Sequence, residues 1–170
     1  KGLDSVIYIT IGTGVGVGVW VNGGLLHGML HPEGGHVFLP RHPKDPEGGI
    51  CPYHKNCLEG FASGPAIEAR WGKKAVELVD RPEVWELESY YIAQALVDYI
   101  LVLSPQKIIL GGGVMHQEQL FPMIRANVLE MLNGYINTEE LGDMDNYIVP
   151  ASLKDNQGIM GLSLIHISEP

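Results

Sequence analysis

The sequence predicts one α/β domain, in which a small antiparallel sheet is followed by helices that alternate with two further strands. Short apolar runs rich in β-branched residues, separated by glycine turns, occupy the first part of the chain and are typical of consecutive hairpins. The rest of the chain carries apolar residues at spacings of three and four, interrupted by two short β-branched runs. The 170 residues suffice for one domain with its own core, or for one lobe of a larger protein.

The composition is that of an ordinary folded domain, with 45% hydrophobic and 18% charged residues. A net charge of −9 without any basic cluster argues against nucleic acid or an anionic membrane as the main partner. No apolar run is long enough to cross a bilayer. Cys51 and Cys57 bracket a histidine, which suits a metal in a reducing compartment better than a disulfide. We therefore expect a cytoplasmic protein.

Three strands are predicted at the beginning of the chain. Residues 6–10 form an apolar, β-branched run, and residues 15–21 resume as a strand with glycine at alternate positions. Asn22-Gly23-Gly24 is a strong hairpin signal, because asparagine and glycine tolerate positive φ angles. A third strand begins at residues 25–27. We expect two consecutive antiparallel hairpins.

The turn between the first two strands is rich in glycine and threonine. Glycines let the main chain approach phosphate oxygens and threonine hydroxyls add donors, so this turn is a candidate phosphate cradle. A plain hairpin turn is the competing interpretation, and the residues alone favour it because short glycine motifs are common. The candidate residues are Thr10, Gly12, Thr13 and Gly14.

Helix signals follow residue 62. Ser63 is placed as an N-cap with Pro65 in the first turn, and this helix is predicted to end near Trp71-Gly72. A second helical piece is predicted at residues 73–79, before the break at Asp80-Arg81-Pro82. Later helices are predicted at residues 86–103, at 120–135 and from a cap at Asp155-Asn156, and strands at residues 107–110 and 147–150.

Gly111, Gly112 and Gly113 follow the predicted strand at residues 107–110 directly. A strand that ends in glycines before a helix leaves a crevice at the sheet edge in a layered α/β fold. Contact with a flat ligand such as an adenosine and a simple tight turn explain these glycines equally well.

Residues 31–59 are too rich in proline, glycine and histidine to fold around apolar contacts alone. Cys51-x-x-His54-x-x-Cys57 supplies three ligands of the kind that zinc prefers, and His36 or His42 can complete a tetrahedron. A metal in this loop would also fix the directions of two flanking carboxylates. These carboxylates belong to Glu33 and Glu59.

Together these motifs resemble the ROK family of bacterial sugar kinases. Glu33-Gly34-Gly35-His36 is similar to the family's Glu-x-Gly-His motif. Residues 51–59 are similar to its cysteine-rich zinc motif, with His54 in place of the usual middle cysteine and with altered spacing. This form of the motif, followed by residues 62–72, is most similar to the fructokinase branch. The resemblance covers residues 3–162 and implies one lobe of the actin/hexokinase-type (ribonuclease H-like) ATPase fold, with an inserted zinc-binding loop.

The resemblance implies roles for individual residues. Glu33, His36 and Glu59 would bind sugar hydroxyls. His36, Cys51, His54 and Cys57 would hold a structural Zn²⁺, with His42 as the rival for the fourth position. Thr10, Gly12, Thr13 and Gly14 match the fold's second phosphate loop, and Gly111, Gly112 and Gly113 match its adenosine loop.

The implied activity is transfer of the γ-phosphoryl group of Mg²⁺·ATP to a hexose, with fructose favoured and fructose 6-phosphate as product. The family's catalytic aspartate and first phosphate loop lie upstream of the position of Lys1. We therefore expect a C-terminal lobe, residues 1–162, that is inactive alone. Family members are often homodimers, and we expect the same here. Residues 163–170 depart from the preceding small-residue pattern and are expected to be foreign to the fold.

Three alternatives stay open. Another hexose of the same family, such as glucose, mannose or an N-acetylated hexosamine, fits the three sugar-binding residues equally well. A sugar-sensing repressor would carry a helix-turn-helix domain upstream. A zinc-stabilised binding domain without catalysis would fold in a metal-dependent way and ignore nucleotides.

Overall fold

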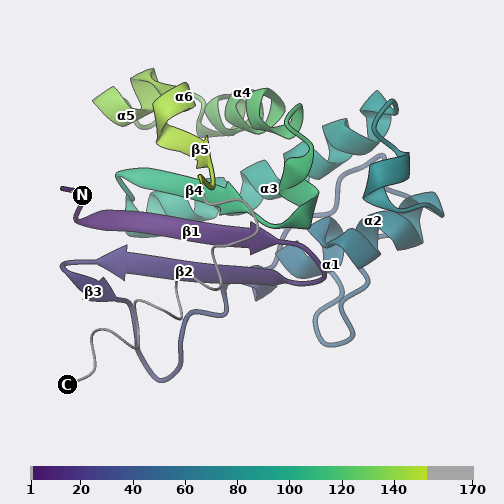
Figure 1. Cartoon of the computed structure of the whole chain (residues 1–170), viewed down its shortest axis with the longest axis horizontal. Helices are drawn as coiled ribbons and strands as arrows, with labels where there is room; N and C mark the ends of the chain where they lie inside the picture. The colour runs from purple at the N-terminus through teal and green to yellow at the C-terminus, as the bar shows by residue number, and fades with distance from the viewer. Residues whose placement is uncertain (1, 153–170) are drawn as a thin grey trace.

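A computed structural model describes residues 2–152 and shows a mixed sheet with strand order β3-β2-β1-β4-β5 (Figure 1). β1 pairs antiparallel with β2, and β2 with β3, whereas β4 runs parallel to both β1 and β5. The predicted hairpins and the two later strands are therefore confirmed. The strands are β1 (Ser5–Ile11), β2 (Val15–Val21), β3 (Gly24–Leu25), β4 (Lys107–Gly111) and β5 (Ile148–Pro150).

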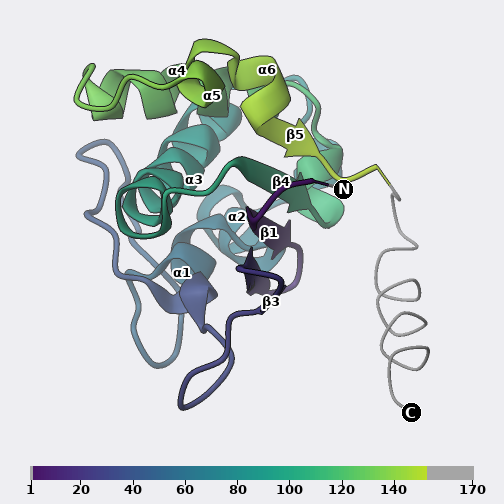
Figure 2. The ribbon, with the colours of Figure 1, turned by 90° about the vertical axis from the view of Figure 1, so that its left-hand side faces the viewer.

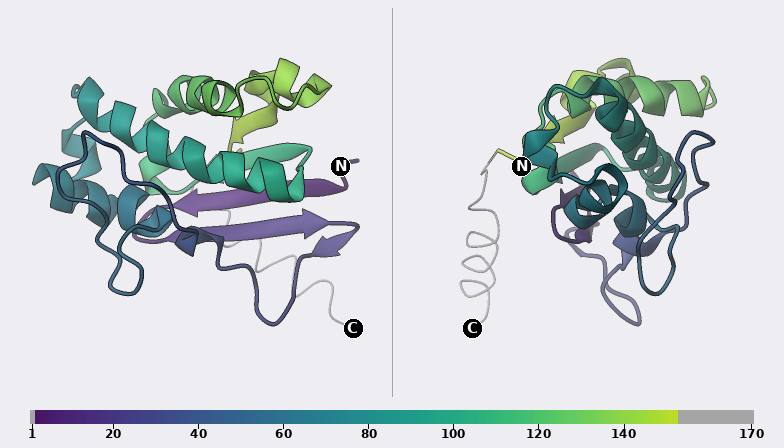
Figure 3. Two further views of the ribbon diagram at one scale, coloured as in Figure 1. Left: turned by 180° about the vertical axis from the view of Figure 1, so that it is seen from behind. Right: turned by 90° about the vertical axis from the view of Figure 1, so that its right-hand side faces the viewer.

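The longest helix, α3, lies across one face of the sheet (Figure 3), and α1 lies on the same side (Figure 2). The α-helices are α1 (Leu58–Ala62), α2 (Gly64–Trp71), α3 (Pro82–Leu103), α4 (Leu120–Leu132), α5 (Glu139–Gly142) and α6 (Met144–Tyr147). Three single turns of 3₁₀ helix complete the described chain: η1 (Gly34–His36), η2 (Ala75–Glu77) and η3 (Gly113–His116).

The core lies between the sheet and the helices. Ile7, Ile9 and Ile11 alternate along β1 and are buried, as the period of a half-buried strand requires. Phe61 of α1 stacks on Tyr91 of α3, with ring centroids 4.0 Å apart. These contacts join the first hairpin, α1 and α3 into one apolar cluster, so α1 is held against the sheet.

The predicted hairpin turn and the predicted start and end of α2, which depend only on neighbouring residues, are confirmed. Asn22 and Gly23 both have positive φ angles, 52° and 84°, as the tight β2–β3 hairpin requires. The Ser63 side chain accepts a hydrogen bond from Ala66 N and caps α2. Gly72 ends α2 in the left-handed conformation.

Two predicted helix boundaries are wrong for identifiable reasons. α3 begins at Pro82 rather than at residue 86, because proline is well tolerated at the first helical position, where it starts a helix instead of breaking one. α4 ends at Leu132 rather than at residue 135, because Asn133 and Gly134 both adopt positive φ angles.

Short elements account for the other differences. The helix predicted at residues 73–79 reduces to the single turn η2, and the Trp85 indole N–H donates to the carbonyls of Leu78 and Val79. The third strand is shorter than the predicted residues 25–27. α1, α5 and α6 were not predicted, although Thr138 and Asp143 are ordinary N-caps of the last two.

The helix predicted from Asp155-Asn156 and the tail at residues 163–170 lie outside the described residues, so both stay predictions. Within residues 2–152, no helix is long and apolar enough to cross a membrane.

Gly112 is expected to tolerate no side chain. Its φ of 93° and ψ of 168° fall in a region that is essentially restricted to glycine, and a Cβ there would lie 2.4 Å from the Ile11 carbonyl oxygen. Gly112→Ala should lower the free energy of unfolding by at least about 1–3 kcal/mol, measured by urea denaturation. Gly113→Ala is the matched control, because a Cβ at Gly113 meets nothing within 4 Å. Equal stability of the two variants would contradict this account.

Candidate functional site

Four side chains from the loop between β3 and α1 converge on one point. One ligand atom from each of His36, Cys51, His54 and Cys57 lies within 4.8 Å of the other three. The Cys51 sulfur is 3.9 Å from His36 Nδ1 and 3.8 Å from His54 Nδ1, and the Cys57 sulfur is 3.6 Å from His36 Nδ1. The loop therefore gathers two sulfurs and two imidazole nitrogens in a compact group.

The spacing of these atoms fits a tetrahedral zinc site. Zn–S bonds of about 2.3 Å and Zn–N bonds of about 2.0–2.1 Å place neighbouring ligand atoms roughly 3.3–3.8 Å apart. Three of the nitrogen–sulfur separations, 3.6–3.9 Å, are close to this range, and no two of the four ligand atoms are more than 4.8 Å apart. Sulfur and imidazole are also the donor types that structural zinc sites use.

The two cysteines differ in acidity. Burial raises the pKa of the Cys57 thiol, and the adjacent Cys51 sulfur raises it further. Burial also acts on Cys51, but backbone hydrogen bonds at His54 and Tyr53 outweigh it and lower the pKa of the Cys51 thiol. Two adjacent buried thiolates need a cation to be stable together, so metal binding should release a proton from Cys57.

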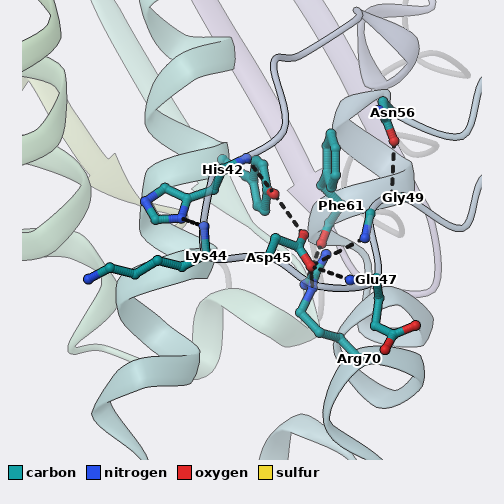
Figure 4. Close-up of polar contacts among 10 residues, drawn as sticks. His42, Lys44, Asp45, Glu47, Gly49, Asn56, Phe61 and Arg70 are labelled. Atoms are coloured by element: carbon teal, nitrogen blue, oxygen red, sulfur yellow. Dashed lines mark hydrogen bonds and ion pairs between the residues drawn. The ribbon is translucent and has the colours of Figure 1, made fainter.

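His42, the rival for the fourth position, is engaged elsewhere. Its Nδ1 accepts a hydrogen bond from Lys44 N at 3.1 Å (Figure 4), and its ring packs edge-on against Tyr90. His42 is not part of the four-residue cluster, in which His36 is the fourth residue.

Glu59 lies between this cluster and the first hairpin. Cys57 is the N-cap of α1, where its sulfur accepts a hydrogen bond from Gly60 N, so Glu59 falls in the first turn of α1. Glu59 Oε2 accepts a hydrogen bond from Val15 N at 3.0 Å, and its Oε1 is 4.0 Å from His36 Nε2. A single carboxylate therefore contacts the end of the glycine turn while facing a cluster histidine.

The turn that carries Glu33 and His36 is held on two sides. A Cβ at Gly35 would lie 2.0 Å from the Val15 carbonyl oxygen, so only glycine fits against β2 at this position. The Tyr99 hydroxyl, from α3, donates to the Gly34 carbonyl at 2.7 Å. Glu33 is exposed, in keeping with a group that meets a ligand from solvent.

The two glycine segments meet at one edge of the sheet. Parallel pairing aligns Thr10 of β1 with Gly111 of β4, which brings the turn after β1 beside the turn after β4. Gly64 N, at the start of α2, donates to the Gly12 carbonyl at 2.7 Å. A cavity of about 780 Å³ opens beside the second turn, lined by Gly111, Gly112, Met115, Phe121, Arg125 and neighbouring residues.

The positioning groups around the site were not predicted. The Val15 N–H and the Tyr99 hydroxyl act across long sequence separations, and no local pattern marks either of them. Asp45 carried a usable signal, since Asp-Pro-Glu-Gly is a turn sequence in which an aspartate accepts hydrogen bonds from the backbone that follows.

Comparison with known proteins supports the resemblance found in the motifs. A family model described as "ROK family" matches residues 1–169. The chain belongs to the ROK family. A Bacillus subtilis (strain 168) relative is 60% identical over 168 residues, which is 98% of this chain and 56% of that protein. A protein of Pediococcus pentosaceus named fructokinase is 50% identical over 95% of this chain and 55% of its own length. The chain thus spans little more than half of these relatives.

Solved structures confirm the predicted fold. A ROK hexokinase from Thermus thermophilus matches 99% of this chain and 60% of its own with a TM-score of 0.79 at 24% identity. A ROK family glucokinase from Streptomyces griseus, in complex with glucose and AMPPNP, matches 97% of this chain and 61% of its own with a TM-score of 0.73 at 23% identity. The predicted fold class, an actin/hexokinase-type ATPase fold, is therefore confirmed.

Metal content distinguishes the two candidate fourth ligands. We expect the purified chain to hold about one Zn²⁺, measured by inductively coupled plasma mass spectrometry. His36→Ala and Cys57→Ser should lose it, and the serine retains the cap of α1. His42→Ala should keep it. A folded wild-type chain without metal, or loss of the metal from His42→Ala alone, would contradict this assignment.

Proposed function

We propose that the full-length protein is an ATP-dependent fructokinase, which converts fructose to fructose 6-phosphate. The observation that carries the proposal is the position of Glu59, whose carboxylate contacts the glycine turn of the first hairpin and faces His36. A sugar held at this carboxylate would lie next to a backbone able to receive phosphate. Relatives named fructokinase at 50% and 42% identity support the choice of fructose.

Glu33, His36 and Glu59 would bind the sugar. Carboxylates accept hydrogen bonds from sugar hydroxyls, and charged acceptors make the stronger ones. A metal on His36 Nδ1 would leave the proton on Nε2, so that His36 offers an N–H on the side that faces Glu59. The histidine and the carboxylate then present a donor and an acceptor to the same ligand.

Thr10, Gly12, Thr13 and Gly14 would hold the phosphates of ATP, and Gly111, Gly112 and Gly113 would contact the adenosine. Both segments lie at the same sheet edge, and the cavity beside the second turn has room for a nucleoside. The glycine turn contributes backbone N–H groups and threonine hydroxyls, the donors that phosphate oxygens accept. Mg²⁺ bound with ATP would neutralise charge as the phosphoryl group is transferred.

A structural Zn²⁺ held by His36, Cys51, His54 and Cys57 would keep the loop in the binding geometry. Cys57 is both a ligand in this proposal and the N-cap of α1, so the metal would fix the start of the helix that carries Glu59. The metal takes no part in the chemistry. Its contribution is to limit the freedom of a loop that is rich in proline and glycine.

The catalytic aspartate is proposed to lie upstream of this chain, which covers 56% and 55% of the length of two longer relatives. Sugar and nucleotide would then be held between two lobes, with residues 1–162 forming the second. The homodimer stays a prediction. The gene sequence upstream of Lys1 separates a kinase from a regulator: an Asp-x-Gly-Gly-Thr phosphate loop favours the kinase, and a helix-turn-helix domain the repressor.

Assay of the full-length protein tests this proposal. ADP release should be fastest with fructose, compared with glucose, mannose and N-acetylmannosamine, and the product should carry its phosphate on O6 by nuclear magnetic resonance. A higher kcat/KM for another hexose would identify that hexose, rather than fructose, as the preferred substrate. Absence of turnover with every sugar would reject the kinase.

Glu59→Gln should raise the KM for fructose at least about tenfold, because a hydrogen bond to a charged acceptor is worth roughly 1.5–3 kcal/mol. The amide oxygen can still accept from Val15 N, so the fold and the KM for ATP should change little. Glu68→Gln, on the exposed side of α2, is the matched control. Equal fructose KM values for the two variants would remove Glu59 from the sugar site.

A further inference from the structure

A second group of polar side chains fastens the same loop at a point away from the metal cluster. Asp45 is 1% exposed and accepts four hydrogen bonds (Figure 4). Its Oδ1 accepts from Glu47 N at 3.1 Å, from Gly48 N at 3.3 Å and from Arg70 Nε at 3.2 Å. Its Oδ2 accepts from the Tyr91 hydroxyl at 2.7 Å. Both oxygens of the carboxylate therefore accept hydrogen bonds, which defines one arrangement of the loop.

The hydrogen-bond partners of Asp45 connect the loop to three different helices. Arg70 lies on α2, and its Nη1 donates to the Phe61 carbonyl of α1 at 3.1 Å. Tyr91 lies on α3, stacks on the Phe61 ring and accepts a hydrogen bond from His42 N at 3.0 Å. The loop is therefore tied to the helix that carries Glu59 and to the two helices that support it.

The Asp45 group also connects directly to the cysteine segment. Just beyond Gly48, Gly49 N donates to Asn56 Oδ1 at 3.1 Å, and Ile50 N donates to the Gly60 carbonyl at 3.0 Å. A Cβ at Gly49 would lie 1.9 Å from the Lys55 carbonyl oxygen, so the backbone segments at Gly49 and Lys55 are in close contact. Displacement of residues 45–48 would therefore move the backbone on which the cysteines lie.

Stability alone is a poor reason for this arrangement. The Asp45–Arg70 ion pair is almost fully buried, with side chains 0% and 2% exposed. Desolvation offsets most of the attraction in such pairs, and apolar replacements are often equally stable. What the hydrogen bonds of this buried pair supply is a defined geometry for residues 45–48, which lie in sequence between His36 and Cys51.

We propose that Asp45, Arg70 and Tyr91 form a positioning site, which sets the geometry of the four metal ligands and the direction of Glu59. None of the three side chains belongs to the ligand cluster. They act through the backbone of residues 45–50 and through α1. The inference rests on the metal-binding part of the proposed function, and it predicts effects on metal affinity that need neither sugar nor nucleotide.

Tyr91→Phe tests the positioning site with little loss of packing, because the ring on Phe61 remains. Zn²⁺ affinity of the metal-free chain, measured by competition with a chelator, should fall about 10–100-fold, the range seen when groups that orient metal ligands are removed. Tyr147→Phe is the matched control: Tyr147 is also a buried tyrosine, at 3% exposure, on α6. It should bind Zn²⁺ within about twofold of the wild type.

The outcomes separate the two proposals. A wild-type chain that binds no Zn²⁺ rejects the metal site itself, and the positioning site with it. A wild-type chain that binds Zn²⁺ while Tyr91→Phe binds it equally well overturns the positioning site alone. Affinities are compared at a temperature where thermal unfolding curves show both tyrosine variants folded, since a purely structural role would shift the curve and leave the affinity unchanged.

Amide hydrogen exchange supplies a readout that does not depend on metal. Tyr91→Phe should accelerate exchange at the amides of Gly48, Gly49 and Ile50 relative to Tyr147→Phe, because the Gly48 amide donates to Asp45 itself and the other two follow it directly in the chain. Asp45→Asn should have the larger effect on both measurements, since it leaves Arg70 buried opposite a neutral group. Unchanged exchange in both variants would overturn the proposal.

Discussion

The convergence of two sulfurs and two imidazole nitrogens in one small volume is the constraint on which the site depends. The loop that supplies them has few buried apolar side chains, and a divalent cation removes the repulsion that two adjacent thiolates would otherwise feel. Cys57 extends this constraint into regular structure, because its sulfur also caps α1. The carboxylate of Glu59, two residues later, is then directed at the first hairpin.

The sheet supplies the second half of the geometry. Parallel pairing of β1 with β4 places two glycine turns side by side, and β2 returns from the first turn to meet Glu59. Gly35 and Gly112 allow backbone contacts that no other residue would permit. In the proposed enzyme, strand pairing therefore brings the sugar-binding and nucleotide-binding residues near one another. These residues are not close in sequence.

Local chemistry made much of the fold predictable. The Asn22-Gly23 turn, the Ser63 cap and the apolar strands depend on neighbouring residues, and all were found. Pro82 was predicted to break the chain, because proline disrupts the interior of a helix. Proline is tolerated in the first turn of a helix, however, and Pro82 begins α3. The cysteine and histidine spacing indicated the candidate metal ligands, but only the three-dimensional structure showed that His36, rather than His42, lies beside the two cysteines. Tyr99 and Arg70 act through contacts distant in sequence, which no pattern of spacing reveals.

The central claim is that a metal in this loop holds the sugar-binding groups in place. The most direct measurement is calorimetric titration of fructose into the full-length protein before and after removal of the metal, with circular dichroism to verify that the stripped protein stays folded. We predict at least about a tenfold loss of fructose affinity on stripping and full recovery with one equivalent of Zn²⁺. Unchanged fructose affinity in a folded, verified metal-free protein would contradict the claim.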